Sequence, residues 1–205
     1  MTLKFKLILC GLLTVAFAAI VPLIITFLHQ KNTTEVQLQE KLKAIVASSS
    51  QFIDGDLHGI IRKGDSKEDF PQDEFDEILS VLTTIKKQNN LHDSVYSMRP
   101  HDDSNLEFVV MTDKDKNGEY YTGNLYPKED FHDEVLAGKV ASTSVYSDKE
   151  GTWISAAAPI YDSTGSVVAL SQADYEISHY YSTLYSHVFK LGKILIVAII
   201  LCIFL

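Results

Sequence analysis

The sequence predicts an α+β domain with an antiparallel sheet of about five strands, flanked by two apolar helices. Three observations lead to this prediction. Apolar runs occupy both ends of the 205-residue chain. Residues 35–53 and 71–88 repeat apolar side chains with helical spacing. Residues 151–177 alternate as two strands joined by a turn.

The first apolar run, Leu7–Leu28, follows Lys4 and Lys6 and contains no acidic residue. Because about 20 apolar residues span a bilayer core, residues 1–28 are expected to form a transmembrane helix with a cytoplasmic N-terminus. A cleaved signal peptide is the alternative, and the triplet Ala16-Phe17-Ala18 would suit its cleavage site.

Residues 29–176 are expected to form one domain that opens with two helices, over residues 35–53 and 71–88. The polar residues 54–69 between them predict a loop or a frayed helix end. Short elements follow, with strands over 95–99, 106–112 and 141–147 and a helix over 127–137. The first helix has an apolar stripe made of Leu38, Leu42, Ile45, Val46, Ser49, Phe52 and Ile53.

The central element is a hairpin of two long strands, about Thr152–Tyr161 and Ser166–Tyr175. Between them Asp162-Ser163-Thr164-Gly165 supplies the turn, where Gly165 can adopt a positive φ. The second strand is apolar on both faces through its first half, which predicts a central position in the sheet. Asp174 follows in this apolar strand, where an ionised carboxylate is costly unless it is paired.

After Asp174 the spacing changes to steps of four and three, which is typical of a helix packed on another helix. Residues 177–205 are therefore expected to form an exit helix that continues into a second transmembrane segment. Its apolar part is close to the shortest span that crosses a bilayer. We expect the chain to be cut within or just beyond this helix; the alternative is a receptor that has no tail there. The repeat consists of Ile177, Tyr181, Leu184, Val188, Leu191 and Leu195.

Charge is concentrated in the middle of the chain, because residues 29–188 hold all 27 acidic residues and 14 of the 18 basic ones. So acidic a surface argues against a nucleic-acid partner and is compatible with cation binding or with solubility alone. Cys10 and Cys202 both lie in the apolar ends. The middle of the chain therefore has no disulfide framework and no cysteine-ligated zinc site.

The segment WISAAAPIYDSTGSVVALSQAD, residues 153–174, resembles the end of a Cache domain, the PAS-like extracytoplasmic sensor module of bacterial receptors. Residues 53–58 and 95–100, the latter followed by 107–110, agree with this resemblance in the same order. Gln172-Ala173 stands where family members often carry Gly-Val before the final Asp.

This resemblance implies a PAS-like antiparallel sheet in a domain outside the cytoplasmic membrane of a bacterium, with one membrane pass on either side. It implies the input module of a histidine kinase, nucleotide cyclase or chemoreceptor that binds a small-molecule ligand and signals by helix displacement in a homodimer. We expect no catalytic activity in these residues. A C-terminal output domain beyond them would be the enzyme, for example a kinase or a cyclase.

A group of polar and aromatic residues forms the predicted ligand pocket. Arg99 could grip a ligand carboxylate, aromatic rings could line an apolar cleft, and Asp174 could accept a hydrogen bond from a ligand amine. For each aromatic residue the alternative is core packing, and for Asp174 it is a structural hydrogen bond to the exit helix. The candidates are Arg99, Tyr121, Tyr126, Tyr146, Trp153, Ser155 and Asp174.

A second candidate site is the acidic loop at 113–119, which resembles the start of an EF-hand calcium loop. Alternating oxygen ligands followed by a glycine suit Ca²⁺, but the twelfth position is Asn124 instead of a bidentate glutamate. An ordinary solvated connection is the alternative. The predicted ligands are Asp113, Asp115, Asn117 and Glu119.

Residues 55–59, GDLHG, match the GDxHG motif of calcineurin-like metallophosphatases. The alternative function is therefore a membrane-anchored, metal-dependent phosphoesterase. A two-metal site needs ligands from several loops, and the later motifs of that family are missing from the sequence. Asp54, Asp56 and His58 are accordingly expected to end the helix and to bond nearby backbone.

Overall fold

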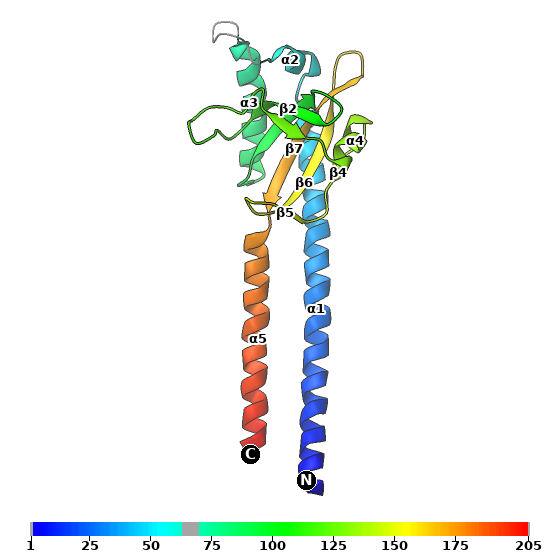
Figure 1. Cartoon of the computed structure of the whole chain (residues 1–205), viewed down its shortest axis with the longest axis vertical. Coiled ribbons are helices and arrows are strands. Elements are labelled where there is room, and N and C mark those ends of the chain that lie inside the picture. Colours follow the sequence, from blue (N-terminus) through cyan, green and yellow to red (C-terminus); the bar gives the residue numbers. More distant parts are fainter. Residues whose placement is uncertain (1, 63–69, 205) are drawn as a thin grey trace. The chain divides into compact units, whose positions relative to one another are not determined.

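A computed structural model describes residues 2–62 and 70–204 of the chain (Figure 1). The chain divides into two compact units, one formed by Gln37–Glu176 and the other by Met1–Val36 together with Ile177–Leu205. Residues 63–69 of the predicted loop lie outside the described residues.

The larger unit is built on a seven-stranded antiparallel sheet in the order β3-β2-β1-β7-β6-β4, with β5 also paired to β6. About five strands were predicted. The difference arises because the predicted strand 141–147 is divided in two and because residues 125–127 add a short edge strand. The strands are β1 (Val95–Pro100), β2 (Asn105–Met111), β3 (Leu125–Pro127), β4 (Ala141–Ser142), β5 (Tyr146–Ser147), β6 (Thr152–Tyr161) and β7 (Val167–Glu176).

The predicted hairpin is confirmed as β6 and β7, which pair from Trp153↔Glu176 to Tyr161↔Val167. Gly165 in the turn has a φ of +84°, a conformation that glycine adopts without steric cost. With β1 on its other side, β7 lies in the middle of the sheet, as its apolar sequence predicted.

Helices cover both faces of this sheet. Ser97 and Ser171 are partners in the β1–β7 ladder and so share a face. On that face Ser49 of α1 (Leu3–Ser50) lies 2.8 Å from Ser171, and His58 of α2 (Gly55–Ile60) lies 3.0 Å from Ser97. Figure 1 shows α4 (Asp130–Leu136) beside β4 and β6, and its His132 bonds Gln172 on the opposite face.

The predicted stripe of residues 35–53 is buried at its centre, where Leu42, Val46 and Ser49 are at most 1% exposed. Phe52 departs from the prediction, since 72% of its surface is exposed. The reason is that α1 ends at Ser50, so Phe52 no longer follows the helical period. The second predicted helix is α3 (Gln72–Gln88), whose Phe75, Ile78 and Leu82 are buried.

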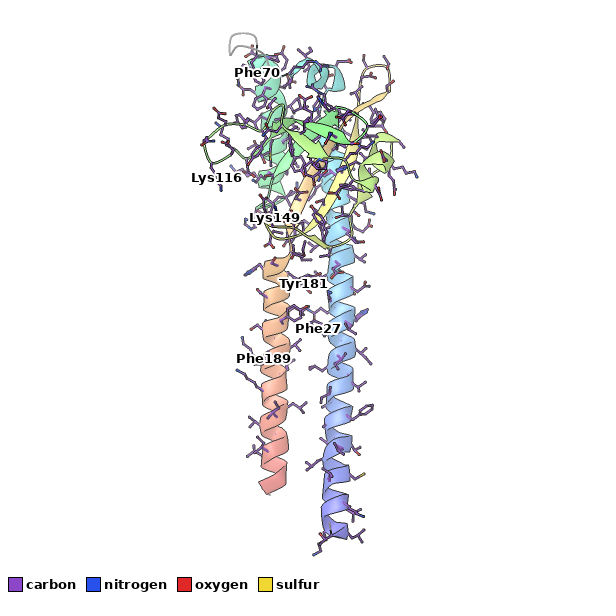
Figure 2. The ribbon with its side chains drawn as sticks, viewed as in Figure 1. Phe27, Phe70, Lys116, Lys149, Tyr181 and Phe189 are labelled. Atoms are coloured by element: carbon purple, nitrogen blue, oxygen red, sulfur yellow. The ribbon has the colours of Figure 1, made fainter. Side chains whose placement is uncertain are left out.

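In the smaller unit, the first part of α1 packs on α5 (Ser178–Phe204). Thr34 and Tyr180 share a 2.8 Å hydrogen bond, Tyr181 donates to Glu35, and the rings of Phe27 and Tyr185 lie 5.6 Å apart. Figure 2 shows Phe27 and Tyr181 directed between the two helices.

The predicted heptad repeat of α5 therefore has a partner helix, which is α1 of the same chain. Leu184 is buried, and Leu184, Val188 and Leu191 line a groove together with Pro22, Leu23, Thr26 and Phe27. Among the described residues, one helix, α1 over Leu9–Ser50, is long and apolar enough to cross a membrane. A membrane crossing by α5 stays a prediction.

Candidate ligand-binding site

A cavity of about 400 Å³ opens on the face of the sheet opposite α1 and α2. Five of the seven predicted pocket residues line it, which are Tyr121, Tyr126, Tyr146, Trp153 and Asp174. The other described lining residues are His92, Asp93, Ser94, Tyr96, Phe108, Met111, Asp113, Asp148 and Glu150. Whether they contact a ligand stays a prediction.

Asp174 is held in this cavity by three hydrogen bonds. The register of the central hairpin places Ser155 opposite it, and the Ser155 hydroxyl donates to Oδ1 over 2.6 Å. Gln172 Nε2 donates to the same oxygen over 3.2 Å, and the Tyr96 hydroxyl donates to Oδ2 over 2.8 Å. Burial nevertheless raises the pKa of Asp174, because these three donors do not fully offset the loss of water and Asp93 adds repulsion.

The hydrogen bonds behind Asp174 have a fixed direction. The backbone N–H of Glu129 donates to His132 Nδ1 over 2.9 Å, so the imidazole proton is on Nε2. His132 Nε2 then donates to Gln172 Oε1 over 2.9 Å. This orients the amide so that Gln172 Nε2 donates to the Tyr96 hydroxyl over 2.6 Å as well as to Asp174. Burial lowers the pKa of His132, which keeps the imidazole neutral.

An aromatic wall stands beside this carboxylate. The Phe108 ring lies 5.2 Å from that of Tyr96, 6.0 Å from Tyr121 and 5.7 Å from Tyr126, measured between centroids. The Tyr146 hydroxyl lies 2.9 Å from Ser155 Oγ and donates to it, since Ser155 itself donates to Asp174. Burial raises the pKa of Tyr146 to about 12, so its hydroxyl stays protonated at neutral pH.

Trp153 closes the cavity at the loop between β5 and β6. Its indole N–H donates over 3.0 Å to Asp148, which also accepts from the backbone N–H groups of Glu150 and Gly151. These backbone and indole bonds lower the pKa of Asp148. The half-buried indole is thus held in one orientation at the edge of the cavity.

The structure places Arg99 away from the cavity, and the predicted grip on a ligand carboxylate has no geometric basis. Its Nη2 and Nε donate to the two carboxylate oxygens of Glu107 over 2.8 and 3.2 Å, and Nη1 donates to the carbonyl of Ile61 over 2.6 Å. Arg99 and Glu107 are direct partners across the β1–β2 ladder. Three of the five guanidinium N–H groups are therefore committed, two of them to tying β1 to β2 and one to the C-terminal end of α2.

The acidic loop does not support the calcium prediction. Both Asp113 oxygens accept from Lys86, over 2.7 and 2.9 Å, and Ser94 donates to one of them over 2.6 Å. Asp115 instead caps its own turn by accepting from the backbone N–H groups of Asn117 and Glu119. Among the described residues no group of three or more acidic, histidine or cysteine side chains could hold a metal ion. Figure 2 shows Lys116 projecting from this loop.

The GDLHG segment has a structural role in the described fold. A Cβ on Gly55 would lie 2.4 Å from the carbonyl oxygen of Tyr161, so the backbones of α2 and β6 approach too closely for a side chain. Asp56 accepts a hydrogen bond from the backbone of the β6–β7 turn. His58 is buried against Ser97 and not bonded to backbone as predicted; burial lowers its pKa to about 3. These contacts give no support to the phosphoesterase alternative.

Sequence reasoning missed Tyr96 and Gln172, the two residues that support Asp174 from β1 and β7. Gln172 was noted only as a departure from the family pattern. It lies two residues before Asp174 on the same strand and therefore on the same face, which is a signal that could have identified it.

No family model matches the sequence, and no curated protein matches it. Solved structures of similar fold include the sensor domain of DcuS from E. coli, with 15% identity, a TM-score of 0.44, and coverage of 78% of this chain and 98% of that one. The ligand-binding domain of the Campylobacter jejuni chemoreceptor Tlp3, in complex with 4-methylisoleucine, is similar with 12% identity, a TM-score of 0.44, and coverage of 77% and 57%.

The periplasmic sensory domain of the Campylobacter jejuni chemoreceptor Tlp1 is similar with 16% identity, a TM-score of 0.38, and coverage of 73% of this chain and 62% of that one. The chain thus spans about three fifths of the length of the two chemoreceptor domains.

Proposed function

We propose that this chain is the ligand-sensing input module of a membrane-anchored bacterial signalling receptor. The observation that carries the proposal is the cavity around Asp174. A carboxylate held by three donors in an aromatic cavity is a suitable anchor for a small molecule. Asp174 lies on β7, four residues before the first residue of α5. A conformational change of β7 at the cavity can therefore pass along the backbone to that helix.

In this proposal residues 1–28 cross the cytoplasmic membrane with the N-terminus inside, and α5 returns to the same side. The unit of residues 37–176 then lies outside the cytoplasm. Labelling of single introduced cysteines by a membrane-impermeant reagent tests this arrangement. Lys149→Cys, in an exposed loop, should be labelled in intact cells, whereas a cysteine introduced at Lys4 should not.

Ligand binding would signal by displacing α5 along α1. A ligand shifts such an equilibrium only if it binds one arrangement more tightly than the other, and helix displacements of about 1–2 Å are typical. A homodimer and a C-terminal output domain, such as a kinase, a cyclase or a chemotaxis signalling domain, complete the proposed receptor. Fold does not choose among these outputs.

The experiment uses the full chain in lipid nanodiscs, after Cys10→Ser and Cys202→Ser. Cysteines at Phe27 and Tyr185, whose rings lie 5.6 Å apart, report on the displacement through their rate of disulfide formation. A panel of amino acids, amines and organic acids should contain a compound that changes this rate. The same compound should have no effect after Asp174→Asn. A rate that no saturating ligand changes would contradict signalling by helix displacement.

A further inference from the structure

The cavity carries an excess of negative charge. Five of its described lining residues are acidic, and none is a lysine or an arginine. Lys86 neutralises only Asp113, through a 2.7 Å ion pair. Arg99, which could have supplied a positive charge, is bound to Glu107. The five acidic residues are Asp93, Asp113, Asp148, Glu150 and Asp174.

Most hydrogen-bond donors of the cavity are also committed to the protein, the exceptions being the side chains of His92 and Tyr121. Five lining side chains already donate to oxygen atoms of neighbouring residues, four of them to carboxylates. A ligand carboxylate would have to replace those acceptors while lying close to several acidic side chains. Like charges brought together in an interface are strongly unfavourable. The five donors are Ser94, Tyr96, Tyr126, Tyr146 and Trp153.

What the cavity does offer is acceptors and ring faces. A carboxylate has about four acceptor positions. Two donors occupy Asp174 Oδ1 and one occupies Oδ2, so an acceptor position remains on a residue that lines the cavity. The aromatic wall around Phe108 presents π-systems, which attract organic cations at distances up to about 6 Å. A volume of about 400 Å³ accommodates a small organic molecule.

We propose, on the basis of the sensing role above, that the ligand of this cavity is an organic ammonium ion that lacks a carboxylate. Its ammonium group donates to Asp174 Oδ2, and its hydrocarbon part packs against the rings of Phe108, Tyr126 and Trp153. The ligand class is that of alkyl and arylalkyl amines, and not that of amino acids or organic acids.

The test compares probes that share one carbon skeleton. The aromatic set is phenethylamine, phenylalanine and 3-phenylpropanoate, and the aliphatic set is isoamylamine, leucine and 4-methylpentanoate. The full chain in nanodiscs is titrated with each probe, and the fluorescence of Trp153, the single tryptophan, reports binding at the edge of the cavity. We expect the amine of at least one set to bind at least about tenfold more tightly than its amino acid, and the acid not to bind.

Variants connect that preference to the charges. Asp174→Asn should weaken amine binding by about 100-fold or more, because it removes the charge that anchors the ammonium group. Glu150→Gln, in the exposed loop, should weaken it by a few-fold, because it removes only part of the negative electrostatic potential of the cavity. The matched controls Asp76→Asn and Glu77→Gln, which are exposed on α3, should leave binding unchanged. Equal weakening by the control variants would overturn the assignment of the cation to this cavity.

The outcomes separate this inference from the sensing role. If an amino acid or acid binds more tightly than its amine, or if acids from a wider panel bind while amines do not, the ammonium inference is overturned and the sensing role stands. If neither these probes nor a wider panel of organic acids and sugars changes the Trp153 signal or the Phe27–Tyr185 crosslinking rate, the sensing role falls as well.

Discussion

Gln172→Leu is the perturbation that most directly tests the hydrogen-bond chain behind the cavity. Leucine is similar in volume but removes both the acceptor for His132 and the donors to Tyr96 and Asp174. Gln172 and His132 are both fully buried, so the imidazole N–H loses its partner without gaining water. A buried donor left without an acceptor costs about 1–3 kcal/mol, and each lost hydrogen bond about 1 kcal/mol more.

We therefore expect Gln172→Leu to lower the free energy of unfolding by about 3–5 kcal/mol. For a unit of this size the thermal midpoint should fall by roughly 9–25 °C, followed through Trp153 fluorescence of the full chain. His132→Leu made alone leaves a buried acceptor, the side-chain oxygen of Gln172, without its donor. The double variant should recover about 1–3 kcal/mol relative to the sum of the single variants, because the His132–Gln172 contact is then absent from both sides.

Two results would refute this reasoning. Strict additivity of the two single variants would mean that the His132–Gln172 bond does not couple them. A Gln172→Leu variant as stable as the starting protein would mean that Tyr96 and Asp174 do not need the amide. Gln51→Leu, at an exposed position directly after α1, serves as a control for the same side-chain change away from this chain of bonds.

Gly55→Ala should lower the free energy of unfolding by about 1–3 kcal/mol, because the added Cβ would meet the Tyr161 carbonyl. The loss should be the same with and without a chelator. A chelator-dependent loss would support the metal-dependent phosphoesterase alternative. Between pH 7 and pH 5 the starting protein should lose about 2 kcal/mol of its free energy of unfolding through His58. The pKa of His58 is about 3 in the folded protein and about 6.5 in the unfolded chain, so protonation favours unfolding. His58→Gln should flatten this pH dependence in thermal unfolding measured across the pH range. Arg99→Lys should destabilise the fold by about 1–3 kcal/mol through loss of the paired bonds to Glu107, with ligand affinity unchanged; a large change in affinity would make Arg99 a ligand contact.

The long hairpin could be predicted from the sequence because its signals are local. Alternation over ten residues and a turn ending in Gly165 specify β6, β7 and their register without reference to the rest of the chain. The strand predicted over 141–147 lacks this regularity. There the side-chain hydroxyl of Thr143 accepts a hydrogen bond from the backbone N–H of Ser155 over 3.0 Å. This bond interrupts the backbone ladder and separates β4 from β5.

The cavity could be predicted only in part, for a related reason. Tyrosine and tryptophan side chains combine an apolar body with a polar tip and so suit the wall of a cleft, and five of the seven candidates line the cavity. The role of Tyr96 depends on its pairing with Gln172 across β1 and β7, over a separation of 76 residues. Arg99 was assigned to a ligand because its partner Glu107 becomes a neighbour only when β1 and β2 pair.

The contacts in the smaller unit set a lower limit on what a ligand must supply. Sliding α5 along α1 by 1–2 Å breaks the bond between Thr34 and Tyr180 and the bond from Tyr181 to Glu35, which are half-buried. At about 1 kcal/mol for a neutral bond and about 1.5 kcal/mol for one to a carboxylate, the displacement costs roughly 2–3 kcal/mol. A ligand must therefore bind the displaced arrangement roughly 30- to 150-fold more tightly to populate it equally. One hydrogen bond from an ammonium ion to Asp174, made in only one arrangement, has a free energy of this order. Tyr181→Phe should accordingly let the proposed displacement occur at lower ligand concentration, measured by the Phe27–Tyr185 crosslinking rate, and an unchanged concentration dependence would mean that these contacts are retained in both arrangements.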